Sequence, residues 1–149
     1  MGSFFILKQA VNHILGGNQM TRGAYHQARV LYVDDEKDLR VIVSQMLELL
    51  GYEVSSADNG QAGVEKAESW QPDIILMDVR MPVMDGPEAI RVLRSRPGTE
   101  HIPVFVVSAN TDSKTRDSCA RAGATGFFAK PVDIEIIDAT IKKTLKFGN

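Results

Sequence analysis

The sequence contains one cysteine, Cys119, among its 149 residues, so no disulfide bond can form within the chain. A lone thiol suits a reducing compartment, and a small residue packed in a helix is its more common role. No apolar run approaches the length of about 18 residues that a membrane-spanning helix needs. The apolar run at residues 4–7 is too short for a secretory signal and lacks a basic lead-in. These absences predict a cytoplasmic protein that does not bind membranes.

The chain also lacks a strong charge of either sign and any clustering of histidine. Its 17 Lys and Arg residues against 19 Asp and Glu residues give a formal net charge of −2, which offers nucleic acid no overall attraction. The three histidines are scattered, without a His or Cys at metal-ligand spacing, which argues against a transition-metal site. No nucleophilic Ser or Cys has a histidine base on a neighbouring strand end, so triad hydrolysis has no support.

From residue 28 onward, short apolar runs alternate with helical patterns, which predicts a doubly wound α/β fold. The apolar runs predict strands at residues 30–33, 52–57, 73–77, 102–107 and 127–129. Periodic apolar residues and turn signals predict helices at about residues 39–50, 61–70, 85–96, 111–122 and 133–146. Crossovers of helix length join parallel strands, and the favoured strand order is 2-1-3-4-5. The sequence stops at the last helix, so we expect no output domain after it.

The first 27 residues stand apart from this pattern. Phe4, Leu7, Val11 and Ile14 recur at the spacing of a coiled-coil seam, which indicates a short amphipathic helix followed by a linker. A helix of this length is marginal alone in water, so it must dock on something or stay disordered. Docking in a groove, pairing of two chains into a homodimer, and an engineered leader or poorly ordered tail all remain open.

Four chemically active residues end predicted strands: Asp35, Asp78, Ser108 and Lys130, and Asp34 directly precedes the first of them. The ends of parallel strands meet in one crevice, so these side chains are expected to gather at a single point. Crowded carboxylates repel one another by about 1–4 kcal/mol per close pair. Such a cluster suggests a site for a hard cation, and Mg²⁺ together with a phosphoryl group is the expected ligand.

The turn after the first predicted strand is acidic and contains no glycine. Dinucleotide-binding folds and P-loops need a glycine-rich turn there, so both are excluded. Asp34 and Asp35 taken alone would also fit an acidic first helical turn. Asp78 favours the cation site instead, because it ends a buried strand and Pro82 and Gly86 keep the following loop irregular.

Four fragments carry a resemblance to a known family: VDDE, DVRMPVMDG, VVSAN and GFFAKP. In this order and at these separations they resemble the receiver domains of bacterial two-component response regulators, and the resemblance covers residues 28–146. It implies a CheY-like, flavodoxin-like fold for a receiver domain at residues 28–149 of the stand-alone type. It leaves residues 1–27 unexplained.

The resemblance implies a role for each acid. Asp78 would accept a phosphoryl group from the phosphohistidine of a histidine kinase or a phosphotransfer protein. Asp34, Asp35, Asp78 and the backbone carbonyl of Arg80 would hold Mg²⁺ or Mn²⁺.

The resemblance also implies that Ser108 and Lys130 bind phosphoryl oxygens and that the Lys130–Pro131 peptide bond is cis. Phe127 stands where the family often has tyrosine as a rotamer switch. Phenylalanine still allows repacking but offers no hydroxyl, and ordinary core packing is an equal alternative.

The sequence therefore predicts a phosphoacceptor of a two-component system or phosphorelay, which catalyses only its own phosphorylation and dephosphorylation. Its downstream protein partner is unknown. One alternative is a Mg²⁺-dependent phosphohydrolase that works through an aspartyl-phosphate, but haloacid-dehalogenase-type hydrolases need a second acid where this chain has Arg80. The other alternative is a receiver-like scaffold that is never phosphorylated.

Overall fold

The computed structural model describes residues 27–146. The predicted seam of Phe4, Leu7, Val11 and Ile14 lies outside the described residues, and so do the alternatives weighed for it. No helix within the described part of the chain is long and apolar enough to cross a bilayer.

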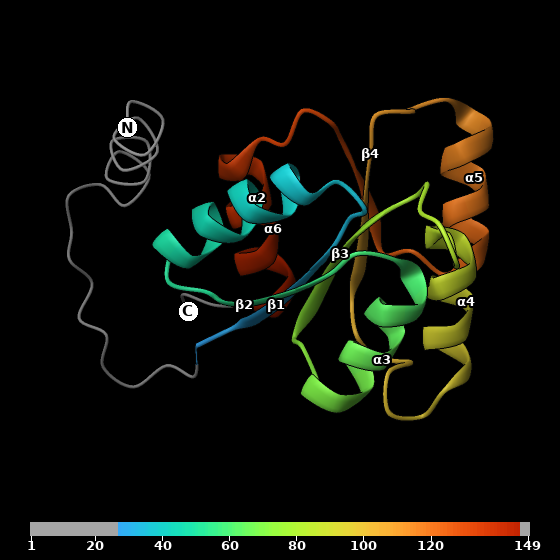
Figure 1. Cartoon of the computed structure of the whole chain (residues 1–149), viewed down its shortest axis with the longest axis horizontal. Helices are drawn as coiled ribbons and strands as arrows, with labels where there is room; N and C mark the ends of the chain where they lie inside the picture. The colour runs from blue at the N-terminus through green and yellow to red at the C-terminus, as the bar shows by residue number, and fades with distance from the viewer. Residues whose placement is uncertain (1–26, 147–149) are drawn as a thin grey trace.

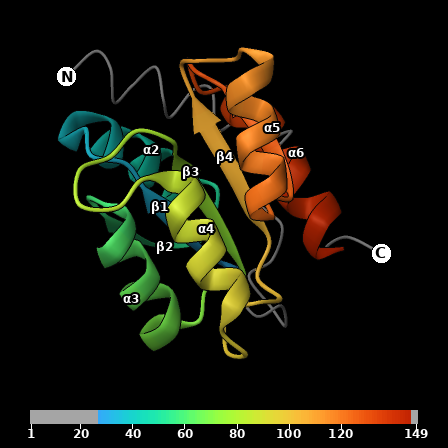
Figure 2. The same ribbon diagram turned by 90° about the vertical axis from the view of Figure 1, so that its right-hand side faces the viewer.

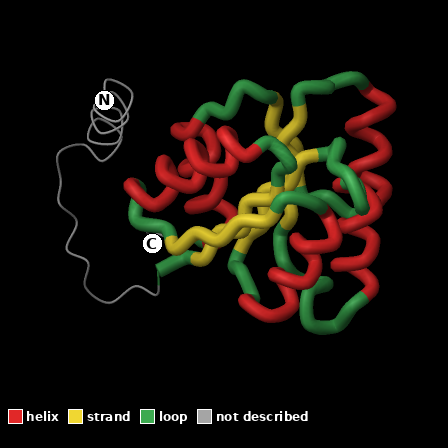
Figure 3. The backbone as a smooth tube through the Cα atoms, viewed as in Figure 1, coloured by secondary structure: helices red, strands yellow, loops and turns green. Residues whose placement is uncertain are grey.

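Five parallel strands form one sheet in the order β2-β1-β3-β4-β5, which confirms the predicted fold and strand order (Figure 1). Helices connect successive strands, as the tube view in Figure 3 shows. The elements are β1 (Arg29–Val33), α2 (Lys37–Leu49), β2 (Glu53–Ala57), α3 (Gly60–Trp70), β3 (Ile74–Asp78), α4 (Gly86–Ser95), β4 (Val104–Ser108), α5 (Ser113–Ala122), β5 (Gly126–Ala129) and α6 (Ile134–Leu145).

Helices cover both faces of the sheet, so each inner strand is buried on both sides. Side chains of α3, α4 and α5 pack on one face, and side chains of α2 and α6 pack on the other (Figure 2). Along β1, Leu31 and Val33 enter the first of these cores, whereas Val30 and Tyr32 enter the second. This alternation follows from the two-residue period of a strand and explains the continuous apolar run in the sequence.

Side-chain caps set several helix boundaries. Asp85 accepts a hydrogen bond from the N–H of Glu88 and begins α4, as predicted. Asp112 accepts from the N–H of Thr115 at 2.7 Å, so α5 begins at Ser113 and not at residue 111. Each capped helix thus begins immediately after a loop that leaves the same edge of the sheet.

One apolar residue of α2 is on the surface. Ile42 falls within the apolar period that predicted this helix, but its exposed fraction is 45%. Val43 and Leu47, four residues apart, define the stripe that faces the sheet. Ile42 is rotated about 100° from Val43 around the helix, which turns its side chain away from that stripe.

Candidate functional site

The strand register brings the predicted site residues to one edge of the sheet. Val33 at the end of β1 pairs with Met77 of β3, so Asp34 and Asp78 follow at the same level. On the other side of β3, Ser108 at the end of β4 pairs with Ala129 of β5, directly before Lys130. The backbone N–H of Lys130 also donates to the Ser108 carbonyl at 2.9 Å.

The three predicted carboxylates form a compact cluster. Asp34, Asp35 and Asp78 each offer a carboxylate oxygen, and these three oxygens lie within 4.8 Å of one another. Asp34 is fully buried and Asp78 is 9% exposed, whereas Asp35 is exposed to solvent. Of the three acids, Asp35 is therefore the one through which the cluster is exposed to solvent.

Lys130 supplies the cation of the cluster. Its Nζ donates to Asp34 Oδ2 at 2.9 Å and to Asp78 Oδ2 at 3.2 Å. Burial alone would lower the pKa of Lys130, but the hydrogen bonds and charges of Asp34 and Asp78 outweigh burial and raise it. Lys130 consequently stays protonated and bridges two acids that would otherwise repel.

Opposing effects act on the Asp78 carboxyl group. Burial raises its pKa above the ordinary value, and the charge of Asp34 raises it further. Lys130 and the backbone N–H of Val79, which donates to Asp78 Oδ1 at 2.7 Å, act in the opposite direction without cancelling the rise. A group that binds Asp78 and brings positive charge would relieve both unfavourable effects.

The donor set fits a hard divalent cation. Three carboxylates face one lysine, which leaves an excess of negative charge, and oxygen ligands of this kind suit Mg²⁺ or Mn²⁺. The carbonyl of Arg80 as a further ligand stays a prediction.

Two glycines hold the loop after Asp78 against the site. A Cβ on Gly86 would collide with the Asp78 carbonyl oxygen, and the Gly86 N–H donates to the Val79 carbonyl at 2.8 Å. A Cβ on Gly60, at the start of α3, would likewise collide with the Met84 carbonyl oxygen, and the Gly60 N–H donates to that oxygen at 3.0 Å. These close backbone contacts fix the position of the strand end that carries Asp78.

Ser108 is buried beside the acids, with 4% of its surface exposed. Its hydroxyl oxygen accepts the N–H of Asn110 at 3.1 Å, which orders the start of the loop after β4. Contact of Ser108 with a phosphoryl oxygen stays a prediction. The Lys130–Pro131 bond is cis, as expected.

Phe127 lies half-buried on β5, where its ring packs against the core under α3, α4 and α5. The guanidinium of Arg116, on α5, lies over the ring at 4.8 Å from its centroid. The ring thus packs as part of the core on one side and meets a surface cation on the other. The switch and core-packing interpretations of Phe127 both stay open.

Sequence reasoning missed Tyr32, which it placed only in the apolar run of the first strand. The Tyr32 hydroxyl donates to Asp34 Oδ2 at 2.8 Å, below the acid cluster. The available signal was the strand period, because residues two apart on a strand face the same side. A tyrosine two positions before an acid is thereby placed within reach of it.

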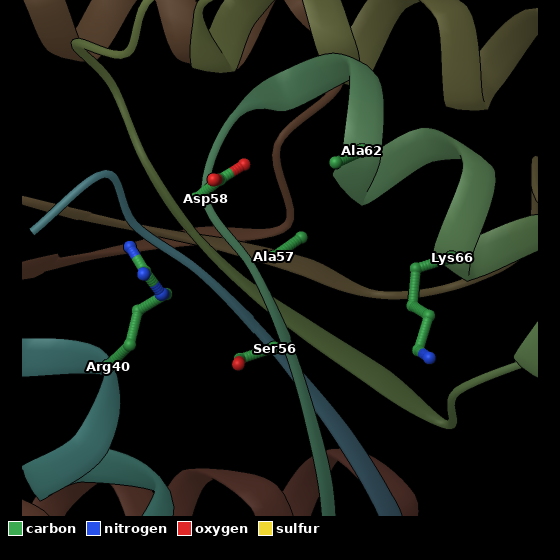
Figure 4. A pocket seen from close by; sticks show the side chains of 6 residues that line it. All are labelled: Arg40, Ser56, Ala57, Asp58, Ala62 and Lys66. Atoms are coloured by element: carbon green, nitrogen blue, oxygen red, sulfur yellow. The ribbon is translucent and has the colours of Figure 1, made fainter. Parts of the chain in front are cut away.

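A groove of about 370 Å³ lies beside the cluster at the edge of β2 (Figure 4). It is lined by Arg40, Ser56, Ala57, Asp58, Ala62 and Lys66. Arg40 links the groove to the cluster, because its Nη1 donates to the Asp34 carbonyl at 2.7 Å. The clustered acids themselves are not part of the lining, so the groove is distinct from the cation site.

Comparison with known proteins identifies the family. The profile of the response regulator receiver domain matches residues 30–142. Protein PilH of Pseudomonas aeruginosa is 37% identical over 118 residues, which are 79% of this chain and 98% of that protein. Regulatory protein AtoC of Escherichia coli is 33% identical over 118 residues, or 79% of this chain, but the chain spans only 25% of its length.

Solved structures agree with these sequence matches. Chemotaxis protein CheY4 of Vibrio cholerae has a TM-score of 0.75 and 33% identity, covering 79% of this chain and 98% of that chain. The receiver domain of the sensor histidine kinase PA1611 of Pseudomonas aeruginosa, solved with a magnesium ion coordinated in its active site cleft, has a TM-score of 0.74 and 30% identity, covering 79% and 97%. With a family match over residues 30–142, the expected strand order and the acids gathered at one sheet edge, the chain belongs to the receiver domains of two-component response regulators.

Proposed function

We propose that Asp78 accepts a phosphoryl group from the phosphohistidine of a histidine kinase or phosphotransfer protein, and that the protein relays a signal in this way. The observation that carries the proposal is the shared lysine: Lys130 bridges Asp78 and Asp34 inside a cluster of three carboxylates. A carboxylate needs no general base to act as a nucleophile. The similarity to a receiver domain of a sensor histidine kinase supports a phosphohistidine as the donor.

In the proposed step, a carboxylate oxygen of Asp78 forms a bond to phosphorus while the bond from phosphorus to the donor imidazole nitrogen breaks. The imidazole leaves with that electron pair, and Asp78 becomes an acyl phosphate. Phosphoryl transfer of this kind needs positioning and positive charge on the phosphoryl oxygens more than covalent assistance.

The residues around Asp78 supply those needs. Asp34, Asp35 and Asp78 would hold Mg²⁺ or Mn²⁺, and the bound cation would neutralise charge on the phosphoryl oxygens. Lys130 Nζ lies 3.2 Å from Asp78 Oδ2, so its ammonium group is close enough to move to the negatively charged phosphoryl oxygens. Val79 holds the other carboxylate oxygen through its N–H.

The output of the proposed reaction is a change of surface. The phosphoryl group would draw the Ser108 hydroxyl inward, move the loop after β4 and let Phe127 repack. The surface formed by α5, β5 and α6 would then shift between two populations that a partner distinguishes. The partner itself is a protein that this site does not identify.

The proposal assigns no turnover of an external substrate. The position two residues after Asp78 is Arg80, an exposed guanidinium where a haloacid-dehalogenase-type hydrolase has its second carboxylate. We place the reaction in the cytoplasm, where ATP-dependent kinases charge their histidines.

Labelling by a small phosphodonor tests the proposal. We expect acetyl phosphate to label the protein in a Mg²⁺-dependent manner, and Asp78→Asn to abolish the label. Asp58→Asn is the matched control, because Asp58 is an exposed acid that follows β2 at the same edge of the sheet. Undiminished labelling of Asp78→Asn would contradict the assignment.

A further inference from the structure

The hydroxyl of Tyr32 reaches the site from inside the protein. Tyr32 lies on β1 with no exposed surface, and its ring belongs to the core shared with α2 and α6. Burial first, and then the charge of Asp34, raise the pKa of the Tyr32 phenol. The phenol therefore keeps its proton and remains a hydrogen-bond donor to Asp34.

Asp34 depends on donors because it is fully buried. Its Oδ1 accepts the N–H of Glu36 at 2.9 Å, and its Oδ2 accepts from both the Tyr32 hydroxyl at 2.8 Å and Lys130 Nζ at 2.9 Å. A buried carboxylate oxygen without a donor loses solvation that the protein must replace. Because two donors share this oxygen, it keeps one hydrogen bond when the other donor moves away.

Of the two donors to Asp34 Oδ2, Lys130 is the one that also contacts Asp78. It already contacts Asp78 Oδ2, and a phosphoryl group on Asp78 adds negative charge on that side. Coulomb attraction then favours movement of the ammonium group from Asp34 toward the phosphoryl oxygens. Asp34 Oδ2 would be left with the Tyr32 hydroxyl.

We propose that Tyr32 is a positioning residue that keeps the Asp34 carboxylate in place when Lys130 turns to the phosphoryl group on Asp78. The inference rests on the proposed function for Asp78 and Lys130. It follows that the Tyr32 hydroxyl contributes little to the unmodified protein and much more to the phosphorylated one. Tyr32 acts through Asp34 and does not touch the reacting atoms.

Beryllium fluoride, a phosphoryl mimic that coordinates carboxylates, allows a direct test. At a fixed Mg²⁺ concentration, the rise in melting temperature on adding beryllium fluoride should be smaller for Tyr32→Phe than for the parent protein. We expect roughly tenfold weaker binding of the mimic, in keeping with the loss of one hydrogen bond to a charged group. A merely structural role would lower the melting temperature of both states alike and leave the rise unchanged, which would overturn the inference.

The chain offers a closely matched control in Tyr52. Its hydroxyl donates to the buried Asp138 at 2.6 Å, and Asp138 also pairs with Lys142 at 3.0 Å. Tyr52 precedes β2 and so lies at the opposite edge of the sheet from the acids. Tyr52→Phe should lower the melting temperature without changing the rise, and an equal loss of the rise in both variants would refute a specific role for Tyr32.

A second measurement needs neither metal nor mimic. Urea midpoints of the parent, Tyr32→Phe, Lys130→Met and the double variant form a cycle in which the Tyr32 change should cost more once Lys130 is absent. Additive changes would refute the inference, because the two donors would then not share the Asp34 oxygen. If the parent protein shows no response to beryllium fluoride beyond that to Mg²⁺ while the cycle is non-additive, the proposed function fails and the shared support of Asp34 stands.

Discussion

Replacing Lys130 with methionine removes the lysine that bridges the acid cluster while keeping a side chain of similar length. In the parent protein its Nζ lies 2.9 Å from Asp34 Oδ2 and 3.2 Å from Asp78 Oδ2, with 16% of the side chain exposed. Breaking a buried ion pair by removing one partner costs about 3–5 kcal/mol. We expect about 3 kcal/mol at pH 7 without Mg²⁺, near the lower limit, because part of the lysine side chain meets solvent.

Urea unfolding measures this cost, and Lys142→Met provides the comparison. Lys142 also pairs with a buried acid, Asp138, at 3.0 Å, but 52% of its side chain is exposed. An exposed pair of this kind contributes about 0–1 kcal/mol. If Lys130→Met and Lys142→Met destabilise the protein equally, the bridge does not hold the cluster together.

The pH and metal dependence of Lys130→Met test the same reasoning from the side of the acids. Lys130 lowers the pKa of Asp78, so its removal raises that pKa further, and the variant should recover stability as the pH falls and Asp78 takes up a proton. Mg²⁺ should stabilise the variant more than the parent protein, because the cation then replaces the missing charge. A destabilisation that neither protons nor Mg²⁺ reduce would refute the electrostatic explanation.

Three further changes have expected outcomes. Burial raises the pKa of Asp78 in the folded state, so the folded protein binds the Asp78 proton more tightly than the unfolded chain does. The free energy of unfolding therefore falls as the pH rises from the pKa of Asp78 in the unfolded chain to its pKa in the folded protein. Asp78→Asn should abolish this loss in metal-free urea unfolding measured across acidic to neutral pH, and an unchanged pH profile would contradict it. Gly86→Ala should cost about 1–3 kcal/mol and reduce acetyl phosphate labelling, because the added Cβ would collide with the Asp78 carbonyl. Gly98→Ala should do neither, because its Cβ would meet Gln71 Nε2 at an ordinary contact distance of 3.9 Å. Arg116→Ala should lower the free energy of unfolding by about 0.5–1 kcal/mol through loss of its contact with the Phe127 ring, while labelling stays at the parental level, and a labelling defect would show that the contact reaches the site.

The sequence alone predicted the fold and the three members of the acid cluster, for a physical reason. Strands buried on both faces are continuous apolar runs, and parallel strands end at one edge, so residues placed directly after such runs must meet. Asp34, Asp78 and Lys130 illustrate this: Asp78 ends β3, Asp34 and Lys130 directly follow β1 and β5, and these positions were enough to bring them together.

The sequence predicted details less well where rotation about an element decides the outcome. Ile42 fits the apolar period of α2 as well as Val43 does, and only packing against the sheet shows which of them is buried. The bond from Tyr32 to Asp34 depends on how far a ring reaches along a strand. Arg116 of α5 lies over the Phe127 ring of β5, and the apolar pattern of the sequence does not give the distance between these two elements.

The ring of Tyr32 has a consequence for how this protein can evolve. It belongs to the core shared with α2 and α6, which also contains Val43, Leu47 and Ile137, while its hydroxyl donates to Asp34 in the site. A conservative exchange in that core that shifts the ring by a fraction of an ångström lengthens the bond to Asp34, even if the fold remains intact. Substitutions in this core are therefore constrained both by the stability of the fold and by the position of Asp34 in the site.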